Sequence, residues 1–416
     1  MGGREYAVFA TGIGLAALHV LDDAFVGKQP GTSAGDHLLT AVVLLAVLGG
    51  SLAVYPRLRA GARAALAASL GILIATAGGM HVAHVVVDEA ELSDFTGILA
   101  AAAGLLLVGL GAVVAWRAPT SSAPRRRWAK RGAIALGSLV VAFYVLFPIG
   151  AAIYITHTPR EPIDAPFAVP HEDVAFETED GLTLRGWYAP SRNGAAIVLV
   201  HGSGSSRLDT REHAGLLAEH GYGVLLYDAR GRGESEGDPN GFNWTWQPDV
   251  DAAVEFLHAR PDVEDGRIGG LGLSAGAEVL IESAARRADL RAVVAEGAGL
   301  RAYGDLLDVP GGGKWVTLPQ TTVMLAASQV LSGWPEARSV GDFVGQGAPG
   351  RVLLIAAGRG AAEEEDLNPL WAERARGRVQ LWELSDGEHT AALDEHPEEY
   401  ERRVIGFVDR RLGGSS

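Results

Sequence analysis

The sequence predicts two parts: an all-α transmembrane bundle of about five helices, and after it an α/β domain with a mostly parallel sheet and helices on both faces. Five apolar segments fill the first 156 residues, and each is near the ~20 residues that cross a bilayer. From residue 171 onward, short apolar runs with strand character alternate with helical patterns, which is typical of a parallel sheet covered by helices. The charge changes as well: residues 1–160 hold 12 Lys and Arg against 8 Asp and Glu, whereas the later residues hold 23 against 42.

Composition excludes several kinds of protein. The 416-residue chain has no Cys, so disulfides, Cys-ligated zinc and a thiol nucleophile are excluded. The acidic second part argues against nucleic-acid binding, because it lacks the cations that would neutralise phosphates. The motifs imply neither a metal nor a cofactor, and protein partners are left open.

The predicted membrane part comprises residues 1–156. Its apolar segments cover approximately residues 6–26, 38–55, 64–87, 95–116 and 132–155. Asp22 and Asp23 interrupt the first segment near its end, and a cleaved signal peptide is the alternative interpretation of it.

The loops between these segments alternate in charge, which predicts their orientation. Arginine and lysine cluster between Arg57 and Arg63 and between Arg117 and Arg131, whereas the other two loops are mainly acidic. Loops rich in Lys and Arg remain in the cytoplasm. We therefore expect a multi-pass protein in the lipid bilayer, with a cytoplasmic N-terminus and an extracytoplasmic α/β domain.

A polar set lies near the expected outer ends of the helices: His19, Asp22, His81, His84 and Asp88. The spacing of the last three places them on one helix face. Two interpretations are open, namely polar residues that pair at the membrane interface, or a site for a metal ion or a lipid headgroup.

Residues 157–170 contain four Pro and are expected to form an extended linker. The α/β domain then covers residues 171–416, interrupted by a helical, apolar insertion from about 300 to 350. Expected elements are a hairpin at 174–177 and 182–189, strands at 195–200, 223–227, 267–271, 291–295, 351–356 and 379–384, and helices at 211–220, 250–259, 277–287 and 398–412.

The pattern Gly-x-Ser-x-Gly occurs twice, around Ser235 and around Ser274. Only Ser274 follows a buried strand and precedes a helix, the context that exposes a serine hydroxyl at a sharp turn. We therefore expect Ser274 to be a nucleophile. A dinucleotide-binding turn, Gly270-x-Gly272-x-x-Ala275 with Glu296 after the next strand, is the alternative interpretation of the same stretch.

Three matched stretches resemble the α/β-hydrolase fold, specifically its serine hydrolases: His201-Gly202-Ser203-Gly204 after an apolar strand, the Asp-x-Arg-Gly-x-Gly-x-Ser-x-Gly turn from Asp228 to Gly237, and the turn that carries Ser274. The resemblance covers about residues 171–412. It implies an oxyanion hole formed by the backbone N–H groups of Ser203 and Ala275, with His201 and Gly202 beside the substrate.

In this family the general base is a histidine after the last strand, a position that His389 occupies; His396 is expected to be a capping or surface residue. The acid that orients the base would come from the run Glu363 to Asp366. We choose Glu364, with Glu363 second and Glu296 as a further possibility.

The resemblance implies that the insertion at 300–350 is a lid, in which Trp315, Met324, Leu325, Trp334 and Phe343 suggest an apolar acyl or lipid substrate, although ordinary packing explains them equally well. The expected function is a membrane-embedded hydrolase of carboxylic esters or thioesters. The alternatives are a serine peptidase or amidase of the aminopeptidase-like type, and a non-catalytic sensor or transport-associated protein. A small-molecule or lipid substrate is expected, and nucleic acid is not.

Overall fold

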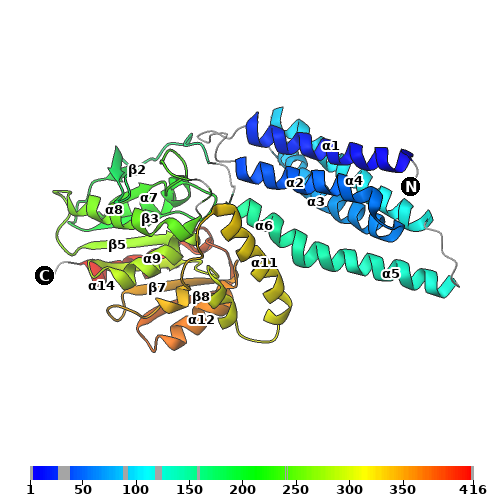
Figure 1. The fold of residues 1–416 in the computed structure, drawn as a ribbon. Coiled ribbons are helices and arrows are strands. Elements are labelled where there is room, and N and C mark those ends of the chain that lie inside the picture. Colours follow the sequence, from blue (N-terminus) through cyan, green and yellow to red (C-terminus); the bar gives the residue numbers. More distant parts are fainter. Residues whose placement is uncertain are drawn as a thin grey trace. The chain divides into compact units, whose positions relative to one another are not determined.

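The computed structural model describes residues 3–26, 38–87, 92–117, 124–156, 160–238, 240 and 242–413. The chain forms two compact units, the first of Met1–Tyr154 with Ala326–Leu331 and the second of Ile155–Leu325 with Ser332–Ser416 (Figure 1). The first unit is helical, and the second contains the sheet.

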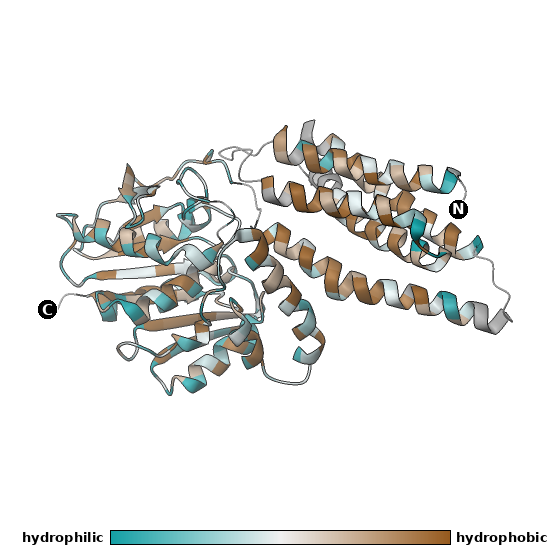
Figure 2. Ribbon diagram, in the orientation of Figure 1, coloured by the Kyte–Doolittle hydropathy of each residue, from teal (hydrophilic) through white to brown (hydrophobic). Residues whose placement is uncertain are grey.

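The helical unit contains all five predicted apolar segments as helices. Its elements are α1 (Gly3–Phe25), α2 (Leu38–Val54), α3 (Ala60–Val87), α4 (Leu92–Arg117), α5 (Pro124–Val141), a π-helical turn (Ala142–Leu146) and α6 (Phe147–Thr156). Apolar residues dominate these helices (Figure 2). By length and composition, three described stretches could cross a membrane, Ala60–Gly79, Phe95–Arg117 and Trp128–Thr156, and Ala41–Arg57 is a shorter apolar helix. Five spans are therefore not confirmed, but three are possible.

Close packing of α3 against α4 depends on glycine. A Cβ on Gly78 would lie 2.3 Å from the nitrogen of Ala101, and one on Gly104 would lie 2.3 Å from the nitrogen of Ala75. Small residues permit this approach of backbones, which is how helices associate in lipid.

Part of the predicted polar set is connected in the helical unit. The hydroxyl of Thr96 lies 3.2 Å from Nδ1 of His19 and donates to Asp22 at 2.7 Å. Asp88 and the side chains of His81 and His84 lie outside the described residues. The interpretation of this set as a metal or headgroup site stays a prediction.

The second unit contains one eight-stranded sheet in the order β1-β2-β4-β3-β5-β6-β7-β8. Only the β1–β2 and β2–β4 pairs are antiparallel, so the prediction of a mostly parallel sheet is confirmed. The strands are β1 (Glu172–Glu177), β2 (Thr183–Ala189), β3 (Ala196–Val200), β4 (Gly223–Tyr227), β5 (Ile268–Leu273), β6 (Leu290–Glu296), β7 (Val352–Arg359) and β8 (Val379–Glu388).

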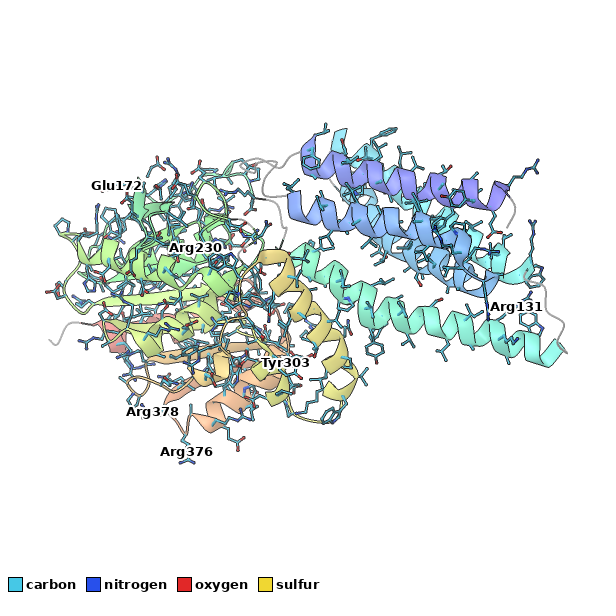
Figure 3. All side chains as sticks on the ribbon, in the orientation of Figure 1. Arg131, Glu172, Arg230, Tyr303, Arg376 and Arg378 are labelled. Carbon is cyan, nitrogen blue, oxygen red and sulfur yellow. The ribbon has the colours of Figure 1, made fainter. Side chains whose placement is uncertain are left out.

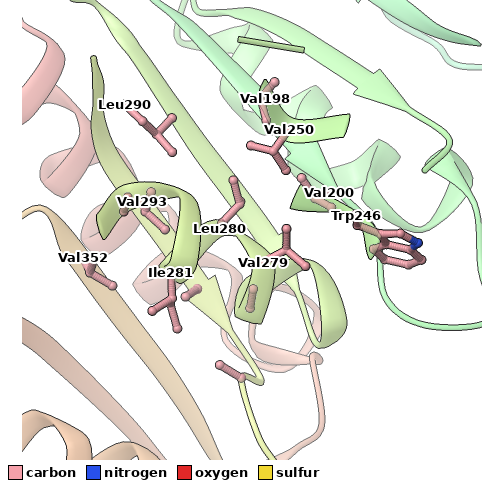
Figure 4. Packing of buried hydrophobic residues seen from close by; sticks show 14 of the residues in the cluster. Val198, Val200, Trp246, Val250, Val279, Leu280, Ile281, Leu290, Val293 and Val352 are labelled. Atoms are coloured by element: carbon pink, nitrogen blue, oxygen red, sulfur yellow. The ribbon is translucent and has the colours of Figure 1, made fainter. Parts of the chain in front are cut away.

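Helices cover both faces of this sheet because its central strands are apolar on both sides. All residues of β3, β4 and β5 are buried. One core contains side chains of α8 (Gln247–His258), α9 (Ala275–Arg286) and α12 (Glu364–Arg374), and Figure 4 shows part of it around Val279 and Ile281. The other core contains side chains of α7 (Arg211–Glu219) and α14 (Pro397–Leu412).

The insertion between β6 and β7 is helical, as predicted. It contains α10 (Tyr303–Asp308) and α11 (Lys314–Ser332) and ends near a 3-10 turn at Val340–Asp342. The carboxylate of Asp305 accepts the N–H groups of Ala302, Val340 and Gly341, each at 3.1 Å. One buried side chain thus joins the two ends of the insertion.

Residues 160–170 of the proline-rich segment form neither helix nor strand and pack on the α/β unit. Phe167 is buried and stacks on Trp187 with ring centroids 5.8 Å apart. Arg160 donates to the carbonyl of Gly237 at 3.0 Å, and the carbonyl of Pro166 accepts from Arg211 at 3.1 Å. Apolar side chains between the prolines therefore attach to the α/β unit a segment whose composition alone predicts an extended linker.

Candidate active site

Ser274 lies at the turn between β5 and α9 with φ 52° and ψ −118°, a region that side chains rarely adopt. Glycine on both sides makes this turn possible. A Cβ on Gly272 would lie 2.5 Å from the backbone of Gly276, and one on Gly276 would lie 2.2 Å from the carbonyl oxygen of Val200. The predicted strand, turn and helix around Ser274 are present, so the hydroxyl stands at the end of the sheet.

His389 reaches Ser274 from the residue that follows β8. Its Nε2 lies 3.0 Å from the hydroxyl oxygen of Ser274, across 115 residues of chain. Gly297, directly after β6, leaves room for the ring, because a Cβ there would lie 2.9 Å from Cε1 of His389. The distance is that of a hydrogen bond, which the removal of a proton from serine requires.

Glu364 meets the other nitrogen of the imidazole. Its Oε2 is hydrogen-bonded to Nδ1 of His389, and its Oε1 accepts the N–H of Ala357 at 2.8 Å. The side chain is completely buried. Glu364 is also the first residue of α12, where the partial positive charge of a helix N-terminus stabilises an anion.

Glu363, the second choice for the acid, faces a different environment. It has a left-handed backbone, with φ 61°, and precedes α12. Burial, followed by the charges of Glu365 and Asp366, raises the pKa of Glu363. Glu296, the third choice, accepts the N–H of Ala392 at 3.0 Å. Of these three acids, Glu364 is the one hydrogen-bonded to His389.

The electrostatic environment favours a basic imidazole. Burial lowers the pKa of His389, but the hydrogen bond and charge of Glu364, with smaller contributions from Glu278 and Glu296, outweigh it and leave this pKa above its ordinary value. A raised pKa makes His389 a better acceptor for the serine proton.

The expected oxyanion donors belong to the start of α9 and to the loop after β3. Ala275 begins α9, so its N–H has no acceptor within the helix. Gly202 approaches the nucleophile from the loop after β3, where a Cβ would lie 3.5 Å from the Cβ of Ser274. Ser203 follows in this loop and is exposed. The role of the N–H groups of Ser203 and Ala275 as oxyanion donors stays a prediction.

The side chain of His201 points into the fold, and its expected contact with substrate stays a prediction. The side chain is fully buried. Its Nδ1 donates to the carbonyl of Gly202 at 2.7 Å, and its Nε2 accepts the N–H of Ala229 at 3.1 Å. Burial lowers the pKa of His201 to about 4, so the ring is neutral at pH 7. His201 fixes the loop that carries Ser203.

The second Gly-x-Ser-x-Gly pattern is structural. Ser235 is fully buried, donates to the carbonyl of Asp228 at 2.6 Å and accepts the N–H of Arg185 at 2.8 Å. Arg230 of the same turn, labelled in Figure 3, donates to Asp249 at 2.7 Å and to Asp180 at 2.7 Å. These hydrogen bonds hold the turn against the sheet, next to the loop that carries Ser203.

Two expected substrate residues remain unconnected to this centre. Trp315, on α11, is 68% exposed, and Met324 of the same helix is partly buried. No hydrogen bond or ring contact among the described residues links either of them to Ser274. Their role in binding stays a prediction.

Sequence reasoning missed Glu278, which lies one helical turn after Ser274. It is almost completely buried and accepts from the side-chain amide of Asn243 at 2.6 Å. Burial raises the pKa of Glu278 to about 7. The available signal was an acidic residue in the first turn of a helix whose buried face is mainly apolar.

The strand order, the strained serine turn and the histidine delivered after the last strand define an α/β-hydrolase of the serine-hydrolase type. The family model of the X-Pro dipeptidyl-peptidases (S15 family) matches residues 169–385, and the chain belongs to this family.

Relatives resemble parts of the chain. The protein Rv2307c of Mycobacterium tuberculosis is 34% identical over 161 residues, which are 36% of this chain and 57% of that protein. The protein YfhR of Escherichia coli is 26% identical over 287 residues, which are 65% of this chain and 91% of that protein. Among solved structures, the Pyrococcus furiosus esterase Pf2001 is 25% identical with a TM-score of 0.50, covering 61% of this chain and 99% of the esterase.

Proposed function

We propose that the chain is a membrane-anchored serine hydrolase that cleaves carboxylic esters or thioesters through an acyl-enzyme. The observation that carries this proposal is that one imidazole ring connects the other two side chains. Nε2 of His389 lies within hydrogen-bond distance of the hydroxyl of Ser274, and Nδ1 of the same ring is hydrogen-bonded to Glu364. This is the arrangement by which an acid and a base activate a serine hydroxyl.

The proposed reaction assigns each step to named residues. His389 takes the proton of Ser274 as the oxygen attacks the acyl carbon, and Glu364 stabilises the imidazolium that forms. The N–H groups of Ala275 and Ser203 donate to the oxyanion of the tetrahedral intermediate. His389 then gives its proton to the leaving alcohol or thiol. A water molecule, deprotonated by His389, hydrolyses the acyl-enzyme in the same way.

An apolar acyl group is the proposed substrate class. The insertion presents apolar side chains such as Trp315 at its surface, and sites for acyl groups are mainly apolar with few polar anchors. The similarity to an esterase of the same fold supports ester cleavage.

A peptidase is the second candidate, and the family match favours it, because the matching model describes X-Pro dipeptidyl-peptidases. The triad would act on an amide in the same sequence of steps, with His389 protonating an amine instead of an alcohol. The two candidates therefore differ in the leaving group and not in the catalytic residues.

A fluorophosphonate probe tests whether the centre is active. We expect it to label the wild-type chain in detergent but not the Ser274→Ala variant. Lack of labelling in both would contradict an enzyme and favour a binding protein of the same fold. Turnover of p-nitrophenyl esters and of X-Pro p-nitroanilides, compared as kcat/KM, then separates esterase from peptidase.

A further inference from the structure

Glu296, at the end of β6, is a buried acid that the proposed mechanism does not use. Its side chain is 2% exposed, and burial of a carboxylate is costly unless hydrogen bonds compensate it. The backbone oxygen of Glu296 accepts the N–H of Ser274 at 2.8 Å. Its side-chain Oε1 accepts the N–H of Ala392 at 3.0 Å. One residue therefore joins the turn that carries the nucleophile to the loop that carries His389.

The loop after β8 needs such support, because its backbone is strained. Thr390, next to His389, has φ 55°, and non-glycine residues in this region persist only where the surroundings fix them. Ala392, which Glu296 holds, lies two residues beyond Thr390. On the other side Gly297 lies against the ring itself. The end of β6 therefore contacts both the imidazole ring of His389 and the loop that carries it.

The second oxygen of Glu296 faces away from the catalytic residues. It lies 3.7 Å from Nε2 of His213 on α7, whose ring packs on Tyr400 of α14 with centroids 5.4 Å apart. Burial, and after it the charge of Glu296, raises the pKa of Tyr400 well above its usual range. His213, Tyr400 and His389 are therefore titratable groups around Glu296, and Glu364 and Glu278 also act on His389.

We propose that Glu296 is a positioning residue: by holding the N–H of Ala392, its carboxylate keeps the His389 imidazole within reach of Ser274. This inference rests on the proposed function of Ser274 and His389. Glu296 does not contact the reacting atoms and acts through the loop.

The test compares Glu296→Gln with Glu296→Ala in the full-length chain in detergent, with p-nitrophenyl butyrate as substrate. Gln keeps an oxygen that can accept the N–H of Ala392, so kcat should remain close to the wild-type value. Ala removes the acceptor, and kcat should fall about 10- to 100-fold with little change in KM, because a displacement of ~1 Å can cost about 10² in rate.

The pH profile gives a readout that a merely structural role would not change. In both variants the pH at which kcat/KM reaches half its plateau should fall, because a negative charge that raises the pKa of His389 is absent. If the Ala variant does not fold, Glu296→Asp takes its place: the shorter side chain withdraws the acceptor from Ala392 but keeps the charge, so kcat should fall while the midpoint stays, and a wild-type kcat contradicts the inference.

Asp262→Ala is the matched control. Asp262 also accepts a backbone N–H, from Ser191 at 2.6 Å, but it precedes β5 at the other end of the strands. This variant should unfold at a lower denaturant concentration with unchanged kcat, KM and pH midpoint. The inference is overturned if Glu296→Ala keeps wild-type kcat and midpoint while Ser274 is still labelled by the fluorophosphonate. A wild-type chain with neither labelling nor turnover instead overturns the proposed function.

Discussion

Two residues at the candidate site have a positive φ, which residues other than glycine rarely adopt. Ser274 has φ 52° and Thr390 has φ 55°, and such conformations cost of the order of 1–3 kcal/mol each. The contacts around these two residues compensate this cost. The helix α9 begins directly after Ser274, and Glu296 accepts the N–H of Ser274 with its backbone oxygen and the N–H of Ala392 with its carboxylate. The geometry of the site therefore depends on residues that do not react.

The acid that orients His389 can be tested with two neighbouring glutamates. Glu364→Gln replaces the carboxylate that meets Nδ1, so we expect kcat to fall by about 10³- to 10⁴-fold, as for loss of the acid in other triads. Glu363→Gln changes the adjacent residue in the same chemical way and should leave kcat near the wild-type value. Equal losses in the two variants, measured by ester hydrolysis, would contradict the assignment of Glu364.

The pH dependence of the reaction follows from His389. The imidazole must be neutral to accept a proton, and its pKa is raised above the ordinary value. Activity should therefore rise with pH through a midpoint above ~6.5, the ordinary value for histidine. In Glu364→Gln the loss of the neighbouring charge should lower this midpoint. A wild-type midpoint below the ordinary histidine value, measured from kcat/KM, would disagree with the electrostatics described.

At the scale of elements, the serine turn depends on how closely β5, α9 and β3 approach. We expect Gly276→Ala to destabilise the chain, because the added methyl group would lie 2.2 Å from the carbonyl oxygen of Val200. Gly215→Ala in α7 is the control, since a Cβ there has nothing within 4 Å, and alanine favours a helix over glycine by about 1 kcal/mol. Urea unfolding should move in opposite directions for the two variants. A neutral Gly276→Ala would argue against the close approach.

His201, in the loop after β3, should make the stability of the α/β unit decrease at acidic pH. His201 has a pKa of about 4 in the folded chain and ~6.5 when unfolded. Below pH 6.5 only the unfolded chain binds the proton, so stability decreases as the pH falls to about 4, by roughly 3 kcal/mol in total. His201→Gln, which cannot titrate, should lose this part of the pH dependence in urea unfolding. An unchanged dependence would show that the ring is protonated when folded.

Much of the second unit could be predicted because strand alternation and turn chemistry are local signals. The order of elements and the turn that carries Ser274 follow from them, whereas the pairing of Ser274 with His389 is implied by the resemblance to the α/β-hydrolase family. Glu364 is our choice from four consecutive acidic residues, and it is the one bonded to His389, but the positive φ at Ala362 and Glu363 that precedes it gives no sequence signal by which Glu363 could be ruled out. The sequence does not indicate that His201 points into the core, because a residue that directly follows a strand can point to either face of the sheet.

At the scale of the whole molecule, the proposed topology follows from charge. We propose that the Lys- and Arg-rich loops are cytoplasmic and that the hydrolase lies outside. The chain has no Cys, so a single introduced Cys reports its own side of the membrane. A membrane-impermeant maleimide applied to intact cells should label Ser416→Cys at once and Ser121→Cys only after lysis. The reverse result would invert the proposed orientation.

The packed segment from Arg160 to Pro170 determines where a water-soluble catalytic fragment can begin. A fragment starting at His171 would lack Phe167 and leave the indole face of Trp187 bare. It would also lose the guanidinium that caps the carbonyl of Gly237. Truncation after the helices, but before Arg160, is therefore the design from which crystals of the α/β unit alone should be sought.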